Sequence, residues 1–420
     1  MSSVVLIILA AWVAIGILVF GGYYRKTLRA LWREPMLRCP VLVFESDDWG
    51  PGKQEQAGQL GKLIELLQGY QDAQGRRPVM TLGVILALPD TEKNKACDLK
   101  TFHRLNLAEP QFQDIRQAMQ RGVEAGVFSL QLHGLEHYWP AALLAAAKQD
   151  KAVKEWLTGD PLPDTERLPA ALQSRWIDGS QLPSRPLAEE KVEQAAREEV
   201  ELFASIFGST PAVLVPPTFV WSPAVERGWA AAGGRTVVTP GQRYEARDAE
   251  NKLLPGGPPI HNGDTSAAGM LYIVRSDYFE PVYGHKAERA LQALMEKRCT
   301  ARPTLLEIHR CNFTQDSALA ERSLTELRRV LDEALRRYPD VAFLSTEAIA
   351  QAFSRNDPAL LEDRFSCRMN AWLQRWREVP RLWSWAKLTG FAAVIALIQR
   401  LLAQGDQPDS NAVQAKDGRA

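Results

Sequence analysis

Two adjacent carboxylates, Asp47 and Asp48, come soon after the mostly apolar stretch 41–45 in VLVFESDDWG. A short run of apolar and β-branched residues predicts a buried strand. Neighbouring like charges repel and raise one another's pKa, so such a pair at a strand end favours a strand that opens into a cleft. The ordinary alternative is a solvated acidic loop, because acidic residues are common on surfaces.

A pair of histidines four residues apart follows a second apolar stretch, in QLHGLEHYWP. If the chain turns into a helix there, His133 and His137 lie on one face, where two neutral imidazoles can bind a divalent cation. Two surface histidines are the ordinary alternative. A third apolar stretch, in PTLLEIHR, ends at His309, for which a core or capping role is the ordinary alternative.

These five polar side chains are expected to meet if their strands are parallel neighbours, because the carboxyl ends of barrel strands converge on one face. One carboxylate and two imidazoles then form a three-ligand metal site with a position left for water, which is typical of hydrolytic metal centres. The remaining aspartate and histidine would serve as a base and an acid.

Short apolar strands alternate with helical patterns across the middle of the chain. Strands are predicted at 41–45, 79–85, 127–132, 212–215, 236–239, 270–274, 304–308 and 341–344. Helices are predicted at 54–67, 109–125, 187–207, 222–232, 286–298 and 317–337. This alternation predicts an α/β domain with a parallel sheet, and the number of units favours a barrel over an open sheet.

The motifs SDDWG, HGLEH and LEIH resemble, in order, those of the polysaccharide deacetylases that share the NodB homology domain, also known as carbohydrate esterase family 4. The resemblance implies a distorted (β/α)7 barrel and a divalent metal held by Asp48, His133 and His137. It also implies that Asp47 is the general base and His309 the general acid. Zn²⁺ suits these ligands best, and Co²⁺, Ni²⁺, Mn²⁺ or Fe²⁺ would be accepted by similar ligands.

The chain departs from the family in the stretch LVPPTF, where Val215 stands at the position of the family's arginine and Thr218 replaces an aromatic residue. In the family that arginine is the partner of the catalytic aspartate. Arg275 and Arg310, each near a predicted strand end, are the candidates to replace it; otherwise the base works unpaired. The resemblance further implies that the backbone N–H of Thr218, next to Pro217, holds the oxyanion of the reaction.

The resemblance implies a metal-dependent hydrolase that removes an N-acyl group, acetyl or formyl, from an amino sugar. The expected substrate is a polysaccharide or a lipid-linked glycan. The competing hypothesis, motivated by the lost arginine, is a degenerate deacetylase fold that acts as a membrane-anchored binding or scaffolding protein. A nucleic-acid partner is excluded, because 50 basic and 50 acidic residues give no basic excess.

The first 24 residues predict a transmembrane anchor. VVLIILAAWVAIGILVF, residues 4–20, carries no charge, and about 20 such residues span about 30 Å as a helix. The segment 25–40 is basic, which by the positive-inside rule predicts a single-pass protein of the inner membrane with its catalytic domain on the cytoplasmic face. Five cysteines without a CxxC pair agree with a reducing compartment. The extracytoplasmic face is the alternative.

The remaining domain boundaries come from breaks in the pattern. The barrel is expected over 41–350, with an inserted surface segment at 138–186 that is rich in proline. A helical extension is expected over 351–403, where LTGFAAVIALI is too short to span a bilayer and predicts an interfacial helix or one packed on the barrel. A disordered tail is expected over 404–420.

Overall fold

The computed structural model describes residues 3–405, and these form two compact units. The sheet unit consists of Cys39–Met295 and Pro303–Asn356. The helical unit consists of the described parts of Met1–Arg38, Glu296–Arg302 and Asp357–Ala420. From residue 406 onward, the predicted disordered tail lies outside the described residues.

One mostly parallel sheet of nine strands forms the centre of the sheet unit, in the order β12-β9-β8-β5-β2-β1-β14-β13, with β15 also paired to β1. The strands are β1 (Val41–Trp49), β2 (Met80–Val84), β5 (Phe128–Leu132), β8 (Val213–Leu214), β9 (Thr236–Thr239), β12 (Leu271–Val274), β13 (Asp277–Tyr278), β14 (Thr304–His309) and β15 (Ala342–Phe343). Each strand predicted from the sequence corresponds to one of these, so the predicted parallel α/β sheet is confirmed.

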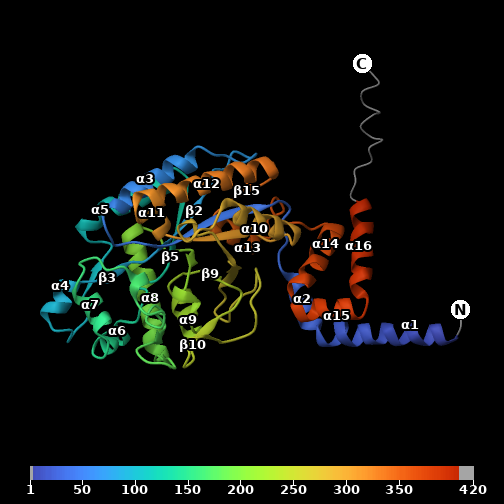
Figure 1. Cartoon of the computed structure of the whole chain (residues 1–420), viewed down its shortest axis with the longest axis horizontal. Helices are drawn as coiled ribbons and strands as arrows, with labels where there is room; N and C mark the ends of the chain where they lie inside the picture. The colour runs from blue at the N-terminus through green and yellow to red at the C-terminus, as the bar shows by residue number, and fades with distance from the viewer. Residues whose placement is uncertain (1–2, 406–420) are drawn as a thin grey trace, which may run out of the picture. The chain divides into compact units, whose positions relative to one another are not determined.

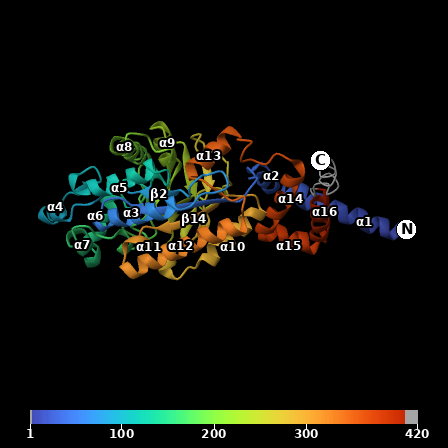
Figure 2. The ribbon, with the colours of Figure 1, turned by 90° about the horizontal axis from the view of Figure 1, so that it is seen from above.

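Helices surround the outer face of the curled sheet, because parallel strands that follow one another in one direction have their right-handed connections on one face. They are α3 (Glu55–Gln68), α5 (Gln113–Glu124), α8 (Glu189–Phe207), α9 (Pro223–Ala231), α10 (Ala287–Cys299), α11 (Cys311–Thr314), α12 (Ser317–Arg337) and α13 (Thr346–Arg355). In both views α8 and α9 lie on the opposite side of the sheet from α12 (Figures 1 and 2). The apolar residues of α12 recur every three or four positions, from Ala320 through Leu324 and Leu327 to Leu331, and all are buried.

The sheet curls until its two edges approach one another. The edge strands β12 and β13 are separated in the chain only by Arg275 and Ser276. Three Cα–Cα steps span at most about 11 Å, so the edges cannot lie farther apart there. The sequence-based expectation was a barrel of seven units, whereas the observed sheet has nine strands and its edges, within the described chain, are not paired to one another.

The predicted insertion at 138–186 has a small core of its own. It holds α6 (Pro140–Ala147), α7 (Lys151–Thr158), the 3-10 turn η3 (Thr165–Arg167) and the strand pair β6 (Ile177–Asp178) and β7 (Arg185–Pro186). Tyr138, Leu143, Val153, Leu157 and Leu168 are buried together there. A hairpin of β10 (Tyr244–Arg247) and β11 (Leu253–Pro255), which no sequence pattern predicted, follows β9.

The helical unit brings together both ends of the described chain. Its helices are α1 (Ser3–Gly16), the π-helical η1 (Ile17–Tyr23), α2 (Arg25–Arg33), α14 (Phe365–Arg375), η6 (Trp376–Glu378), α15 (Pro380–Leu388) and α16 (Phe391–Gly405). Phe20, Leu31, Trp376, Leu382 and Ile395 form its core. The part of the predicted extension from residue 357 onward therefore packs with the amino-terminal helices.

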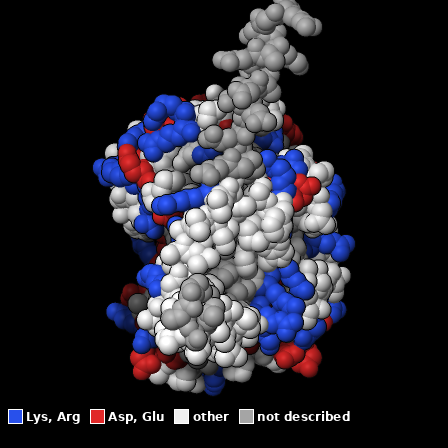
Figure 3. Space-filling model, turned by 90° about the vertical axis from the view of Figure 1, so that its right-hand side faces the viewer, with Lys and Arg blue, Asp and Glu red and all other residues white. Residues whose placement is uncertain are grey.

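The predicted transmembrane anchor is not supported. The predicted span is interrupted at Gly16, where the α-helix changes into η1, and no single helix within residues 3–405 is long and apolar enough to cross a membrane. The bent pair Pro380–Leu388 and Phe391–Leu402 passes the test only when its two helices are combined across a bend of 97°. In the view of Figure 3, uncharged side chains lie in the middle, and both basic and acidic side chains are seen toward the margin. The predicted cellular location, cytoplasmic face or its alternative, stays a prediction.

Candidate metal centre

An irregularity in β1 directs its two aspartates into one cavity. The register between β1 and β2 shifts between Ser46 and Trp49, and Asp48 has a φ of 70°. Consecutive side chains of a regular strand point to opposite faces, and a bulge changes that direction. The indole N–H of Trp49 donates to Ser46 Oγ at 2.8 Å across this irregularity. Asp47 and Asp48 therefore line the same cavity.

The histidines reach that cavity from a loop. His133 follows β5, and residues 133–139 run as an irregular segment before α6 begins at Pro140. The interpretation that placed both imidazoles on one helix face is therefore wrong. The two rings meet because the loop folds back, with Gly134 at a φ of 104° that a residue with a side chain rarely adopts.

The three candidate ligand atoms lie at distances that suit a small cation. Asp48 Oδ1 is 3.4 Å from His133 Nε2 and 3.6 Å from His137 Nε2, and the three atoms lie within 4.8 Å of one another. Two ligand atoms bound to a tetrahedral Zn²⁺ lie about 3.3–3.6 Å apart. Asp48 Oδ1 is buried without a hydrogen-bond partner among the described residues. This donor set fits a divalent metal.

Backbone carbonyls fix the orientation of both imidazoles. The Nδ1–H of His133 donates to Val215 O at 3.0 Å, and that of His137 donates to Gln173 O at 2.7 Å. Each Nε2 is then left for a metal. Burial lowers the pKa of His137 to about 4, which keeps its ring neutral. Val215, which stands where the family has an arginine, thus contributes its carbonyl to the site.

Asp47 is held by one arginine and leaves one oxygen uncommitted. Arg275 Nη2 donates to Asp47 Oδ2 at 2.7 Å, while Asp47 Oδ1 is buried and, among the described residues, has no hydrogen-bond partner. A Cβ on Gly83 of β2 would meet Asp47 Oδ1 at 2.2 Å, so glycine makes room for this carboxylate. Burial raises the pKa of Asp47, but the charges of Arg275 and His133 outweigh it and lower the pKa below its usual value.

Arg275 lies inside a cage of three carboxylates. Besides Asp47, its Nη1 lies 2.9 Å from Glu45 Oε2 and its Nε lies 3.0 Å from Glu307 Oε2. Glu45 and Glu307 are opposite one another in the β1–β14 register, two positions before the pair formed by Asp47 and His309. Of the two arginines proposed to replace the missing one, the structure therefore brings Arg275 to the aspartate.

His309 ends β14 beside the same cavity and is paired with Glu280. The imidazole Nδ1–H donates to Glu280 Oε1 at 2.6 Å. Burial lowers the pKa of His309, but the hydrogen bond to Glu280 and the negative charges of Asp48, Glu280 and Glu307 outweigh it and raise the pKa to about 10. The ring is then protonated at neutral pH, and its Nε2–H is the proton that a general acid needs.

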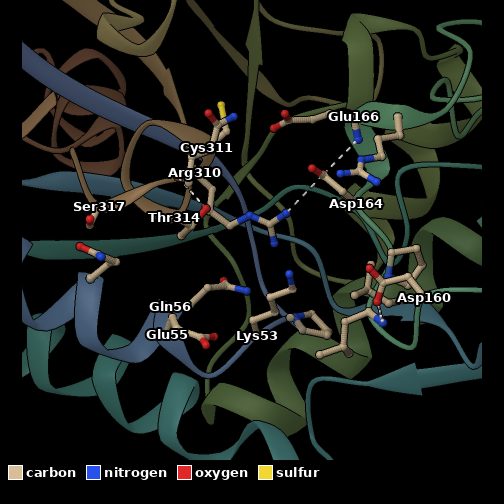
Figure 4. A pocket seen from close by; sticks show the side chains of 18 residues that line it. Lys53, Glu55, Gln56, Asp160, Asp164, Glu166, Arg310, Cys311, Thr314 and Ser317 are labelled. Carbon is tan, nitrogen blue, oxygen red and sulfur yellow. Dashed lines mark hydrogen bonds and ion pairs between the residues drawn. The ribbon is translucent and has the colours of Figure 1, made fainter. Parts of the chain in front are cut away.

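The cavity that these residues line has a volume of about 410 Å³. Thr218 and Arg275 line it, whereas Pro217 is buried and does not line it. Arg310 lies instead in a neighbouring cavity of about 460 Å³, where its guanidinium points to Asp164 at 3.8 Å (Figure 4). Glu166 and Cys311 line both cavities.

Sequence reasoning missed several residues of the site. Glu45 and Glu307 were visible as charges inside apolar strand runs, and a buried carboxylate needs a cation. Glu280 and Arg247 had no such signal, because neither belongs to a strand of the main sheet. The loop after β13 brings Glu280 to His309, and the β10–β11 hairpin brings Arg247 to the cavity.

No family model matches the chain, and no curated protein matches it. Among solved structures, it is similar to a 4-alpha-glucanotransferase from Thermococcus litoralis, with 10% identity and a TM-score of 0.38 over 76% of this chain and 40% of that chain. The chain thus spans less than half the length of that enzyme. For a family 4 acetyl xylan esterase from Clostridium thermocellum the identity is 9% and the TM-score 0.35, over 75% and 91% of the two chains.

A putative polysaccharide deacetylase from Mycobacterium smegmatis also matches, with 11% identity and a TM-score of 0.35 over 77% of this chain and 93% of that chain. Likenesses at these TM-scores carry no argument about chemistry, which rests on the side chains of the cavity. The solved structures that this chain matches include polysaccharide deacetylases and family 4 carbohydrate esterases, the family that its motifs resemble.

Proposed function

We propose that the protein is a metal-dependent hydrolase that removes an N-acyl group from an amino sugar, built on a barrel of the NodB type. The observation that carries the proposal is the cluster of Asp48, His133 and His137, which lies in one cavity with the buried carboxylate of Asp47 and with His309. A three-ligand cation site beside a base and an acid is the arrangement that amide hydrolysis requires.

A divalent cation held by Asp48, His133 and His137 would polarise the acyl carbonyl and lower the pKa of water. Asp47 accepts the proton of the attacking water through Oδ1, the oxygen that no described group occupies. Arg275 fixes the other oxygen and keeps the carboxylate in the charged form that a base needs. As water adds to the acyl carbon, the backbone N–H of Thr218 stabilises the negative charge on its oxygen.

His309 donates its Nε2 proton to the amine nitrogen as the carbon–nitrogen bond breaks. Glu280 stabilises the protonated ring and fixes its direction through Nδ1. The products are a carboxylate, acetate or formate, and a free amino sugar. The proposed substrates are N-acyl sugars of a polysaccharide or of a lipid-linked glycan, and Zn²⁺ is the expected metal.

The competing function is a scaffold that has lost its activity, which the absent arginine at Val215 suggested. The ion pair between Arg275 and Asp47 favours the enzyme, because the aspartate has regained a cationic partner from another strand end. A degenerate site would not require the carbonyl partners that orient both histidines.

The test is metal content by elemental analysis of the purified full-length chain, together with acetate and formate release from N-acyl amino sugars. We expect about one metal per wild-type chain, and loss of both metal and turnover in His133→Ala and His137→Ala. The matched control is His103→Ala, because His103 does not line the cavity and its ring is paired with Thr101.

His309→Ala should retain the metal and lose turnover, because this residue donates a proton and does not bind the ion. Retention of the metal in both His133→Ala and His137→Ala would refute the ligand assignment. A folded wild-type chain that binds no divalent metal and releases no acid would favour the scaffold.

A further inference from the structure

Arg247 is a buried cation in the wall of the metal cavity that the proposed reaction does not use. It ends β10 in the β10–β11 hairpin, and only 7% of its surface is exposed. Its side chain lines the cavity that also contains Asp48, His133 and His309. The hairpin thus brings a second arginine, besides Arg275, to the substrate.

The hydrogen-bond partners of Arg247 are all neutral. Its Nε donates to Ser174 Oγ at 3.2 Å, and its Nη1 donates to the backbone and side-chain oxygens of Asn251 at 3.1 and 3.3 Å. No ion pair within the described chain involves this guanidinium, and Nη2 donates no hydrogen bond there. The neighbouring Asp248 is directed into the hairpin turn, where its Oδ1 accepts from the N–H groups of Glu250 and Lys252.

An unpaired guanidinium in a buried wall is unfavourable, because a buried charge without a counter-charge has lost its hydration. Burial lowers the pKa of Arg247, and no carboxylate opposes that effect. The same cavity contains Arg275, whose three carboxylates neutralise it. The guanidinium of Arg247 is therefore available to bind an anion. Arginine is the residue that binds carboxylate and phosphate best.

The neighbouring cavity differs, because its Arg310 has a carboxylate within ion-pair distance. Lys53 and Arg310 point into it, but Glu55, Asp164 and Glu166 line it as well, and Arg310 lies 3.8 Å from Asp164 (Figure 4). Its bases therefore have acids beside them. Asp47, Asp48, Glu166 and Glu307 also line the metal cavity, but within the described chain none of them lies within ion-pair distance of Arg247.

We propose that Arg247 binds an anionic group of the substrate, a phosphate or a carboxylate, so that the enzyme is specific for acidic N-acyl amino sugars. This inference rests on the proposed deacylation at the same cavity. The cavity volume of about 410 Å³ accommodates a small ligand with such a substituent. Arg247 is on this account a specificity residue that contacts the substrate away from the bond that breaks.

Binding and turnover are measured on matched sugar pairs. N-acetylglucosamine is compared with N-acetylglucosamine 1-phosphate and with N-acetylmuramic acid, which carries a carboxylate. Binding is measured by isothermal titration calorimetry on the metal-free full-length chain, and kcat/KM is measured on the metal-loaded chain. We expect at least one acidic sugar to be preferred by about 10- to 100-fold, the range of a charge-assisted hydrogen bond; the favoured sugar tells phosphate from carboxylate.

In Arg247→Met the preference should fall to within about threefold, while the neutral sugar should bind as before. Arg247→Lys should keep part of the preference, because it keeps the charge but not the planar fork. The matched control is Arg243→Met, which removes an arginine next to β10 that is paired with Glu245 at 2.8 Å and does not line the cavity. Circular dichroism verifies that each variant is folded.

Equal binding of neutral and acidic sugars by the wild type overturns the inference, and this result needs no variant to fold. Loss of binding for neutral and acidic sugars alike in Arg247→Met also overturns it, because the residue would then be structural. If acidic sugars bind through Arg247 and no acid is released by the metal-loaded wild type, the anion site stands and the proposed hydrolysis fails. If acid is released without charge preference, the hydrolysis stands and the anion site fails.

Discussion

Each unit of the molecule contains a fully buried arginine, and the two differ in their partners. Arg275 in the sheet unit is surrounded by three carboxylates, and Arg375 in the helical unit mainly by backbone carbonyls. Arg375 donates to Leu31 O at 2.9 Å, Glu34 O at 3.2 Å and Thr300 O at 2.8 Å. The Glu34 carboxylate, 3.5 Å away, is bonded to Arg302 at 2.7 Å.

The difference appears in the pKa of each guanidinium. Burial lowers the pKa of Arg275, but Asp47, Glu307 and Glu45 outweigh it and raise the pKa well above its usual value. Burial lowers the pKa of Arg375 to about 10. Carboxylates around a cation create a charged centre beside a cavity, whereas carbonyls around a cation join three separate chain segments. The first arrangement suits chemistry and the second suits assembly.

The largest expected effect is that of Arg275→Met. It leaves three buried carboxylates without their cation, and breaking a buried pair costs about 3–5 kcal/mol. We expect faster hydrogen exchange in the peptides of β1 and β14, a stability loss in that range and no measurable turnover. Arg227→Met is the control, because its pairs with Glu189 and Glu193 are exposed and screened by water, so that their loss should have little effect on stability. Equal losses of stability in the two variants would contradict the importance of the three carboxylates around Arg275.

Arg375→Met should have a smaller effect that is confined to the other unit. Unpaired buried carbonyls destabilise by about 1–3 kcal/mol each without adding fully, and the loss of a buried charge offsets part of this. We expect a loss of about 2–3 kcal/mol, seen as faster exchange in residues 28–38 and 365–378. Metal content and turnover should be unchanged. A loss of turnover in folded Arg375→Met would show that the two arginines do not divide assembly from chemistry.

Glu280→Gln should affect His309, which Glu280 pairs with in the sheet unit. The glutamine oxygen still accepts from His309 Nδ1–H, so we expect a small loss of stability, about 1 kcal/mol, with metal retained and turnover lowered about 10- to 100-fold. In the metal-free protein, the protonated ring stabilises the fold below its ordinary pKa of 6.5, and this contribution is lost as the pH rises through about 10. Urea unfolding at pH 7 and pH 10.5 should therefore show a difference between wild type and variant that shrinks at the higher pH. A constant difference would contradict the pairing.

Glu362→Gln in the helical unit should have the smallest effect. The hydrogen bond from exposed Arg364, at 2.8 Å, lowers the pKa of Glu362 to about 2 against the effect of burial. The stabilisation, less than about 1 kcal/mol, is present above the ordinary pKa of 4.5 and is lost as the pH falls through about 2. Urea unfolding at pH 7 and pH 3 should show the difference narrowing at the lower pH. A stability difference between wild type and variant that widens at pH 3 would contradict the lowered pKa of Glu362.

The order of strands and helices and the five polar residues of the site could be predicted from the sequence. The apolar run before Asp47 and the helical spacing in α12 are local patterns, and local periodicity reports burial directly. The parallel arrangement then followed from the alternation of elements. His133 and His137 were correctly expected near Asp48, although by way of a helix that the structure does not contain.

What the sequence determined by itself was which residue types stand at the strand ends, and hence the kind of chemistry to look for. The tertiary structure decided which arginine serves Asp47, that Glu280 supports His309, and that Arg247 enters the cavity without a counter-charge. It also decided that both ends of the described chain form one unit. Asp47 and Arg275 are 228 residues apart. Contacts at such separations leave no local periodicity in the sequence. Only the curled sheet, with Arg275 between its edge strands β12 and β13, brings these two residues together.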